Sequence, residues 1–262
     1  MADDILLNIQ DRVATVTFNR PTQRNAISYE GWLKLQDILT MLENQKEVAI
    51  VVLTGAGKEA FSAGADIKDF EKHRQNSDDA KIYASAFDGA MDTLEAMSKP
   101  TICLIKGFCI GGGCELSMAA DIRIASSTSK FGIPVAKLGI LVGYREMSRL
   151  VDLVGPGNAS FILMSGKLFD AEDALRMGLV NQVVALSDVD EYVYKLAHDM
   201  APLAPLSQSR HKQIMQTVLK NPSLQNLSDE EHELPFTNFD SKDFREGRQA
   251  FIERRKPFFT GE

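Results

Sequence analysis

The chain carries the stretch Gly111-Gly112-Gly113-Cys114-Glu115-Leu116 between two apolar segments. The segment 101–105 precedes it, and the helix-capable segment 116–120 follows it. This order predicts a strand, a glycine turn and then a helix. Such a turn exposes backbone N–H groups at the start of a helix, where they suit a developing negative charge. It also places the carboxylate of Glu115 in the first helical turn, beside that charge.

A second glycine loop lies upstream, in the run Ala60-Phe61-Ser62-Ala63-Gly64-Ala65-Asp66-Ile67-Lys68. It follows another apolar segment, 48–53, which is also expected to be a strand. Two loops of this kind can each contribute one N–H group to a single oxygen atom. That pair of donors is the minimum needed to build an oxyanion hole.

The two motifs, in this order, resemble those of the crotonase superfamily, also called the enoyl-CoA hydratase/isomerase family. The resemblance runs from Arg20-Pro21 to the terminal segment 246–257. It implies an α/β fold in which residues 1–200 form a spiral core of ββα units that holds the acyl-CoA site. It also implies that residues 201–262 form a helical C-terminal region that assembles the chain into trimers or dimers of trimers.

Within this resemblance, the backbone N–H groups of Ala65 and Gly112 form the oxyanion hole for a thioester oxygen. Glu115 matches one of two glutamates that the family's hydratases use as acid and base, although a carboxylate there also complements the helix dipole. The second glutamate is replaced, because alignment through Phe131-Gly132 puts Val135 at its position. Tyr144 and Glu146 are the nearest substitutes, and ordinary packing is the alternative for each.

The resemblance and the positions of nearby residues predict further contacts with the substrate. The predicted substrate- and CoA-binding residues are Lys68, Arg24, Ala63, Asp66, Ile67, Gly111, Val135, Leu138 and Tyr144. Lys256 is a further candidate for the CoA phosphates. Asp69, Glu71 and His73 line the mouth of the pocket or form a solvated helix face. Phe87, Met91, Tyr144 and Phe251 shape the acyl pocket or pack in the core.

Composition and net charge limit the kinds of molecule that the chain is expected to bind. The chain has 262 residues, 44% of them hydrophobic, which is enough for one sizeable core. Its net charge of −7 argues against binding to nucleic acids or anionic membranes, so an anionic CoA ester must meet local lysines and arginines. No apolar run approaches the roughly 18 residues of a membrane span. The acidic N-terminus lacks a signal-peptide pattern, and a cytoplasmic location is expected.

No metal or separate cofactor is expected, and coenzyme A enters only as part of the substrate. Three cysteines, Cys103, Cys109 and Cys114, match no metal or redox spacing and suit small buried positions. The loop 55–60 imitates a dinucleotide-binding fingerprint. However, the glycine-containing segment 62–64 interrupts it where a helix would have to begin.

Periodicity predicts the remaining elements. Strands are expected over 5–9, which pairs with 13–18, and over 48–53, 101–105 and 122–125. Helices are expected over 28–42, from Tyr83 to Met97, and over 145–153, 159–164, 170–178 and 207–219. Two more helices are expected, one from Ser228 and one over 244–255. Ser228 and Glu231 form a capping-box pattern. A boundary is expected near residue 200, after which the strands stop.

These observations predict an enzyme that processes acyl-CoA thioesters, with hydration of a 2-enoyl-CoA as its reaction. Isomerisation of a double bond, or decarboxylation or C–C cleavage of an acyl-CoA, is an alternative on the same scaffold, because each needs the oxyanion hole but not the same acid pair. A homologue that binds acyl-CoA or a protein partner without catalysis is a further alternative, which Val135 motivates.

Overall fold

Two β-sheets form the centre of the molecule. The computed structural model describes residues 3–262, apart from the side chains of Phe70 and Glu71. The larger sheet has the order β1-β2-β3-β5-β7-β10, with strands β1 (Ile5–Gln10), β2 (Val13–Phe18), β3 (Ile50–Gly55), β5 (Thr101–Ile105), β7 (Ile122–Ser126) and β10 (Gln182–Val184). The smaller sheet has the order β4-β6-β8-β9, with strands β4 (Ala60–Ser62), β6 (Phe108–Ile110), β8 (Lys130–Gly132) and β9 (Phe169–Asp170).

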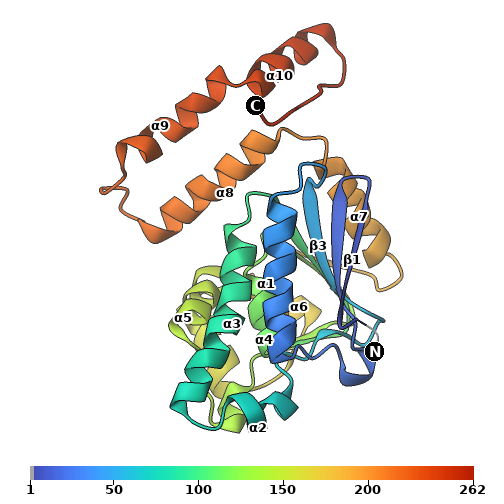
Figure 1. Ribbon diagram of the computed structural model, residues 1–262, viewed down its shortest axis with the longest axis vertical. Coiled ribbons are helices and arrows are strands. Elements are labelled where there is room, and N and C mark those ends of the chain that lie inside the picture. Colours follow the sequence, from blue (N-terminus) through green and yellow to red (C-terminus); the bar gives the residue numbers. More distant parts are fainter. Residues whose placement is uncertain (1–2) are drawn as a thin grey trace.

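Helices surround these sheets, and the last three extend from one end of the core (Figure 1). The α-helices are α1 (Tyr29–Glu43), α2 (Phe70–His73), α3 (Ser77–Ala96), α4 (Gly112–Met118), α5 (Tyr144–Ser165), α6 (Ala171–Met177), α7 (Val189–Met200), α8 (Pro205–Lys220), α9 (Asp229–Thr237) and α10 (Lys242–Glu253). Short 3₁₀ turns are η1 (Pro21–Gln23), η2 (Ile67–Asp69), η3 (Val135–Leu138) and η4 (Asn238–Asp240). No helix of the described residues is long and apolar enough to cross a membrane.

The connectivity is a spiral of ββα units, as the resemblance to the crotonase superfamily implies. Strand pairs β3–β4, β5–β6 and β7–β8 each place one strand in the larger sheet and one in the smaller sheet, and each pair is followed by helix. Within each sheet these successive strands pair in parallel. Each unit therefore repeats the path of the previous one, so that the turns after β4 and β6 come to lie next to each other.

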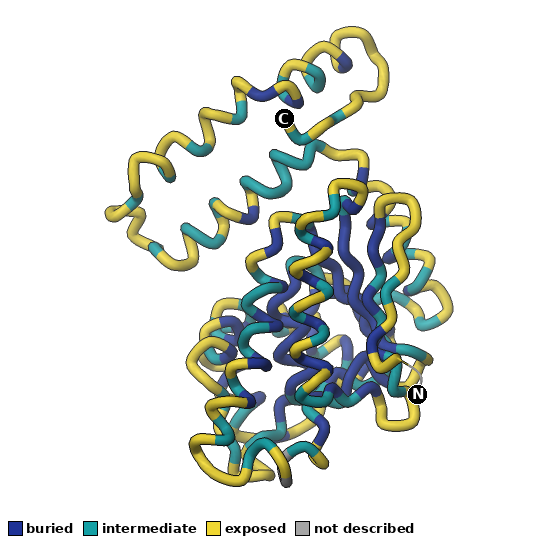
Figure 2. Tube along the Cα trace, in the orientation of Figure 1, coloured by how far each residue is buried: buried dark blue, intermediate teal, exposed yellow. Residues whose placement is uncertain are grey.

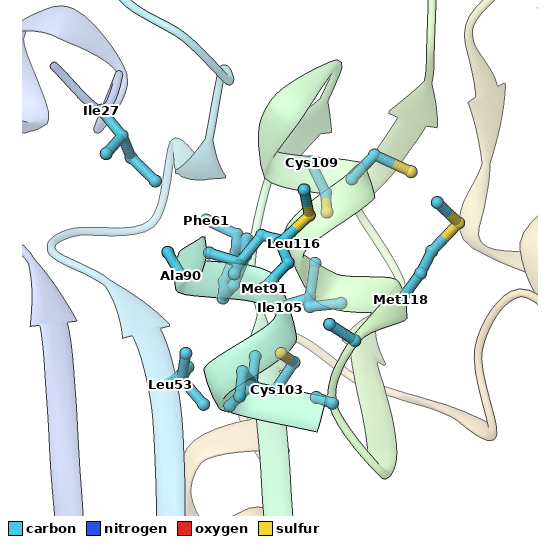
Figure 3. Close-up of a cluster of buried hydrophobic side chains, with 14 of the residues drawn as sticks. Ile27, Leu53, Phe61, Ala90, Met91, Cys103, Ile105, Cys109, Leu116 and Met118 are labelled. Atoms are coloured by element: carbon cyan, nitrogen blue, oxygen red, sulfur yellow. The ribbon is translucent and has the colours of Figure 1, made fainter. Parts of the chain in front are cut away.

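The larger sheet is covered on both faces, which explains its continuous apolar strands. In β3, Ile50 and Val52 point into a cluster with α7, whereas Val51 and Leu53 point into the main core. This alternation follows from the two-residue period of a strand. Figure 3 shows the main core, where Met91 of α3 and Leu116 of α4 lie among sulfur-containing and aliphatic side chains from both sheets.

Helix α1 begins where the sequence predicts. The Ser28 side chain accepts a hydrogen bond from the Gly31 N–H group and caps the helix. Trp32 donates its indole N–H to the Tyr83 hydroxyl at 2.9 Å, which fixes α1 against α3. The two long helices therefore form one wall of the core beside the glycine turns.

The short strands were not predicted. The sequence places the glycine turn directly after strand 101–105, which is wrong, because β6 intervenes. Three-residue strands such as β4, β6 and β8 are too short to show a period of two in the sequence. The two helices expected over 145–153 and 159–164 are confirmed, because α5 consists of two helical segments that meet at Gly155, whose backbone is not helical (φ +73°), and at Pro156. The capping box at Ser228 and Glu231 and the helix from Asp170 to Gly178 are confirmed.

The C-terminal helices contrast with the core in exposure. Figure 2 shows mostly exposed or half-buried positions along α8, α9 and α10, whereas the sheets are buried. Helix α8 is held to the core by Lys212, whose ammonium group lies 2.8 Å from the Asp121 carboxylate. The predicted boundary near residue 200 lies at the end of α7, the last helix that packs against the larger sheet. The division into two parts at that point stays a prediction.

Candidate functional site

The two glycine turns meet at backbone contact distance. A Cβ atom on Gly64 would lie 2.7 Å from the Gly112 nitrogen, and a Cβ atom on Gly112 would lie 3.3 Å from the Ala65 nitrogen. Gly64 also has a φ of +93°, a conformation that side chains rarely adopt. Glycine at position 64 therefore allows the Ala65 and Gly112 amides to approach each other.

Hydrogen bonds between the two glycine turns and neighbouring segments fix the orientation of these two amides. The N–H of Ile27 donates to the Gly64 carbonyl and the N–H of Asp66 donates to the Ile27 carbonyl, which turns the Ala65 N–H away from Ile27. Gly111 donates to the Gly132 carbonyl and so anchors the turn that precedes α4. Across the described residues, neither the Ala65 N–H nor the Gly112 N–H has a protein acceptor. Two N–H donors without a protein acceptor among the described residues therefore lie next to each other.

Glu115 lies one turn into α4, beside these donors. Only 6% of the residue is exposed. The pKa of its carboxyl is raised to about 8, first by burial and then by the negative charge of Glu146, while the positive charge of Arg74 partly offsets both effects. A carboxyl whose pKa lies near neutrality can both accept and donate a proton, which is the property required for acid–base catalysis.

Aromatic side chains wall the site on the side of α1 and α3. A Cβ atom on Gly112 would lie 3.0 Å from the Phe87 ring and 3.5 Å from the Trp32 ring. The guanidinium of Arg74 lies 3.8 Å from the centre of the Tyr83 ring. Burial raises the pKa of Tyr83 to about 12, so this hydroxyl stays protonated. The wall is therefore apolar, with one cation at its edge.

Val135 opens η3 and packs against the main core while remaining half-buried. The valine side chain carries no titratable group, so this position does not supply the second carboxyl of the family's acid pair. Glu146, in the first turn of α5, is the second buried carboxylate near Glu115, with 4% of the residue exposed. Burial raises its pKa, and the negative charge of Asp88 adds to this effect.

Three of the nine predicted substrate- and CoA-binding residues lie on the surface near the first glycine loop. Ile67 and Lys68 are exposed in η2, and Arg24 is exposed with its guanidinium 4.8 Å from the centre of the Phe108 ring. The Ala63 N–H donates to the Arg24 carbonyl at 2.9 Å, which links this residue to the loop. Asp66 is buried and forms an ion pair with Arg20, with 2.8 Å between the charged groups.

The other predicted residues lie in three places: on the surface near the start of α5, in the main core, and in the C-terminal region. Leu138 and Tyr144 are exposed before and at the start of α5. Met91 is fully buried and packs in the main core. Phe251 and Lys256 lie on α10 and in the segment after it, at the far end of the molecule from α4 (Figure 1). This single chain therefore does not bring these last two residues to the glycine turns.

The candidates for the mouth of the pocket have structural contacts. Asp69 accepts a hydrogen bond from the Tyr29 N–H at 2.6 Å, and the His73 ring stacks on the Tyr29 ring with 4.6 Å between centres. The side chain of Glu71 lies outside the described residues. Sequence reasoning missed Arg74 and Asp88, because neither belongs to a motif and only the packing of α3 brings their charges to Glu115.

The three cysteines are free and buried, as the sequence predicts. Burial raises the pKa of the Cys103 thiol to about 12 and raises that of Cys109 as well, so neither is a thiolate at neutral pH. Among the described residues no group of three or more potential ligands is arranged to hold a metal ion. The loop 55–60 leads into β4 instead of the helix that a dinucleotide fingerprint opens.

A ββα spiral with two amides converging beside a buried glutamate defines a crotonase-type protein. Residues 8–262 match the family model for enoyl-CoA hydratase/isomerase, and the chain belongs to this family. A short-chain-enoyl-CoA hydratase of Clostridium acetobutylicum is 35% identical, with 97% of this chain and 96% of the relative covered. A crotonyl-CoA hydratase of Syntrophomonas wolfei is 33% identical, with 98% of each covered.

A solved structure of an enoyl-CoA hydratase/carnithine racemase from Magnetospirillum magneticum has a TM-score of 0.95 and 36% identity to this chain. The match covers 100% of this chain and 97% of that one. The similarity therefore includes the C-terminal helices as well as the spiral core, and it confirms the fold class that the glycine motifs predict.

Proposed function

We propose that this chain is an enoyl-CoA hydratase, which adds water across the double bond of a 2-enoyl-CoA thioester. The observation that carries the proposal is the meeting of two acceptor-free amides, those of Ala65 and Gly112, beside the buried carboxyl of Glu115. The hydratase names of the relatives support it.

The chemistry follows from where charge develops. When water adds at Cβ, negative charge moves to the thioester oxygen, which then resembles an enolate oxygen. Two fixed N–H donors stabilise this oxygen more in the transition state than in the bound substrate. Glu115 takes a proton from the attacking water or delivers a proton to Cα, and its pKa of about 8 suits both roles.

Coenzyme A enters as part of the substrate, and we propose no further cofactor. Lys68 and Arg24 are exposed close to the first glycine loop, where they can meet the phosphates of CoA. Isolated cations of this kind are compatible with a chain of net charge −7, because the anionic ligand needs only local positive charge.

We also propose that the chain works as a homotrimer or a dimer of trimers. Helices α9 and α10 and the segment after them expose large apolar side chains, among them Phe236, Phe239, Phe251, Ile252 and Phe258. A concentration of exposed apolar surface on extended helices supports burial against other copies of the chain.

Incubation with crotonyl-CoA, followed by the loss of enoyl-thioester absorbance and chromatography of the product, tests the hydratase proposal. We expect formation of the 3-hydroxyacyl-CoA and a fall in kcat of at least about 100-fold for Glu115→Gln, with little change in ligand binding. Binding of CoA esters without turnover would contradict the enzyme proposal. Conversion of only a 3-enoyl-CoA or a carboxylated acyl-CoA would replace hydration by isomerisation or decarboxylation.

A further inference from the structure

Glu146 is a buried carboxylate whose contacts do not explain its burial. Only 4% of the residue is exposed, and its Oε1 atom has no hydrogen-bond partner among the residues that the structure describes. The nearest cation, Arg149 Nη1, lies 3.7 Å away and is itself buried without a hydrogen-bond partner. A buried polar atom without a partner costs roughly 1–3 kcal/mol. An unpartnered carboxylate oxygen in a family member therefore suggests a partner that arrives with the ligand.

The side chain of Glu146 folds back over the start of α5. Its Oε2 atom lies 2.5 Å from the point that a Cβ atom on Gly143 would occupy. Gly143 has a φ of −70°, so the backbone there would accept other residues, and glycine is needed only for the space that the carboxylate fills. The carboxylate thus lies over the loop that leads from Val135 and η3 into α5.

Charged groups from two other helices act on this carboxylate. Glu115 comes from α4 and Asp88 from α3. The positive charge of Arg74, from the segment before α3, acts on Glu115. Arg149 lies on α5 itself, but its guanidinium is shared with Asp92 at 2.6 Å and Glu95 at 2.8 Å. The cations are therefore outnumbered near Glu115 and Glu146, and like charges this close favour retention of a proton by one of the carboxyls.

We propose that Glu146 is the second acid–base residue of this enzyme and works with Glu115 on the two reacting carbons. The inference rests on the proposed hydration of a 2-enoyl-CoA. It places the second carboxyl on α5 and not on η3, where Val135 leaves an apolar side chain.

The proton balance of this pair is simple. The ionised carboxyl takes a proton from water as the water oxygen bonds to Cβ, and the electron pair of the C=C bond shifts toward the thioester. Negative charge collects on the oxygen held by Ala65 and Gly112. The protonated carboxyl then gives its proton to Cα, and the thioester carbonyl is restored. One water is consumed, and the single proton of the pair ends on the other carboxyl, from which it returns through solvent.

The alternative is that Glu146 only complements the N-terminus of α5, as a glutamate in the first helical turn does. Glu146→Gln separates the two roles, because the amide keeps the size and polarity of the side chain but does not transfer protons. We expect its kcat for hydration to fall at least about 100-fold, with KM changed by less than about threefold, and one limb of the pH profile of kcat to disappear. Glu172→Gln, an exposed acid in the first turn of α6, is the matched control and should match the unmodified chain.

A second pair of variants moves the carboxylate without removing it. Gly143→Ala places a methyl group 2.5 Å from Oε2, so the carboxylate has to move, and we expect the variant to lower kcat at least about tenfold. Gly157→Ala, on the same helix with open space around it, should leave kcat unchanged. If Glu146→Gln does not fold, the comparison of Gly143→Ala with Gly157→Ala tests the role of Glu146.

The outcomes separate the two proposals. Hydration by the unmodified chain with an unaltered rate and pH profile in Glu146→Gln would overturn the role of Glu146 and leave the hydratase proposal standing. Absence of hydration in the unmodified chain would overturn the hydratase proposal, and this inference with it.

Discussion

At the scale of single residues, the buried carboxyl of Glu115 lowers the free energy of unfolding when it is ionised. Glu115 is buried and has no ion pair among the described residues, and burial raises its pKa because the ionised form is unfavourable in the folded state. Below the pKa of an unfolded glutamate, near 4.5, the carboxyl is protonated in both states. As pH rises from there to about 8, the unfolded state ionises first, so the free energy of unfolding falls.

Glu115→Gln should therefore stabilise the protein at pH 8 while it removes activity. We expect a rise in melting temperature of about 2–4 °C at pH 8 and little change at pH 4, because glutamine lacks the ionisation that favours unfolding. Differential scanning calorimetry at both pH values measures it. A gain in stability of the same size at pH 4 and pH 8 would show that burial does not raise the pKa of Glu115.

The sequence predicts the backbone donors better than the charges around them. Ala65, Gly112 and Glu115 lie within contiguous glycine motifs, and the structure brings the two amides together beside the carboxyl. Arg74 and Asp88 reach the site only because α3 packs beside α4, and no local pattern shows this. Sequence motifs do not identify residues whose function depends on packing between distant elements.

At the scale of elements, the close contact of the two glycine turns is the feature that most limits substitution. A methyl group on Gly64 would meet the Gly112 nitrogen at 2.7 Å and the Ile110 carbonyl at 2.8 Å. Gly64→Ala should therefore separate the two amides and lower kcat by at least about 100-fold, the usual loss for one oxyanion donor.

The matched control for Gly64→Ala is Gly57→Ala. Gly57 also has a positive φ, +79°, but a Cβ atom there meets nothing within 4 Å. Both variants carry the same type of backbone penalty, so kcat of the Gly57 variant should stay within about twofold of the original. Equal kcat values for the two variants with crotonyl-CoA would rule out the contact between the turns as a functional requirement.

Element length explains which parts of the fold were predictable. Helices α1 and α3 and strands β2 and β3 span enough residues to show a period, and their expected positions agree with the structure to within a few residues, apart from the N-terminal turns of α3. The strands of the smaller sheet have two or three residues each and show no period. Their pairing depends on the spiral path of the chain, which only the family resemblance implied.

At the scale of the whole molecule, an ion pair between Lys212 and Asp121 links the C-terminal helices to the core. Lys212 on α8 lies 2.8 Å from Asp121, and it also donates to the Lys99 carbonyl. Asp121 additionally accepts hydrogen bonds from Thr101, so it is held in place from the core side. The pair thus holds α8 to the core, together with the hydrogen bond that Gln216 donates to the Glu95 carbonyl.

Lys212→Met should lower the free energy of unfolding by about 1–2 kcal/mol in urea titrations. The loss is smaller than the roughly 3–5 kcal/mol of a fully buried pair, because the Asp121 side chain keeps 24% of its surface in water. Lys220→Met, at the exposed end of the same helix, is the control and should stay within about 0.5 kcal/mol of the original. A loss of the same size in both variants would remove the special role of Lys212.

The proposed assembly has its own test. Phe236 and Phe251 are 65% and 86% exposed in the single chain, so a charge at either position should disrupt contacts between copies. We expect light scattering to give three or six times the mass of one chain for the original protein and a smaller mass for Phe236→Asp and Phe251→Asp. Arg248→Asp, an exposed position on α10, should keep the original mass. A monomer in the unmodified protein would contradict the assembly.

The central claim is that the amides of Ala65 and Gly112 bind the same thioester oxygen. A crystal structure of the Glu115→Gln variant with crotonyl-CoA bound measures this directly. We predict that the thioester oxygen lies about 2.7–3.1 Å from both nitrogen atoms, as oxyanion-hole donors do. A thioester oxygen beyond hydrogen-bonding distance of either amide would contradict the account.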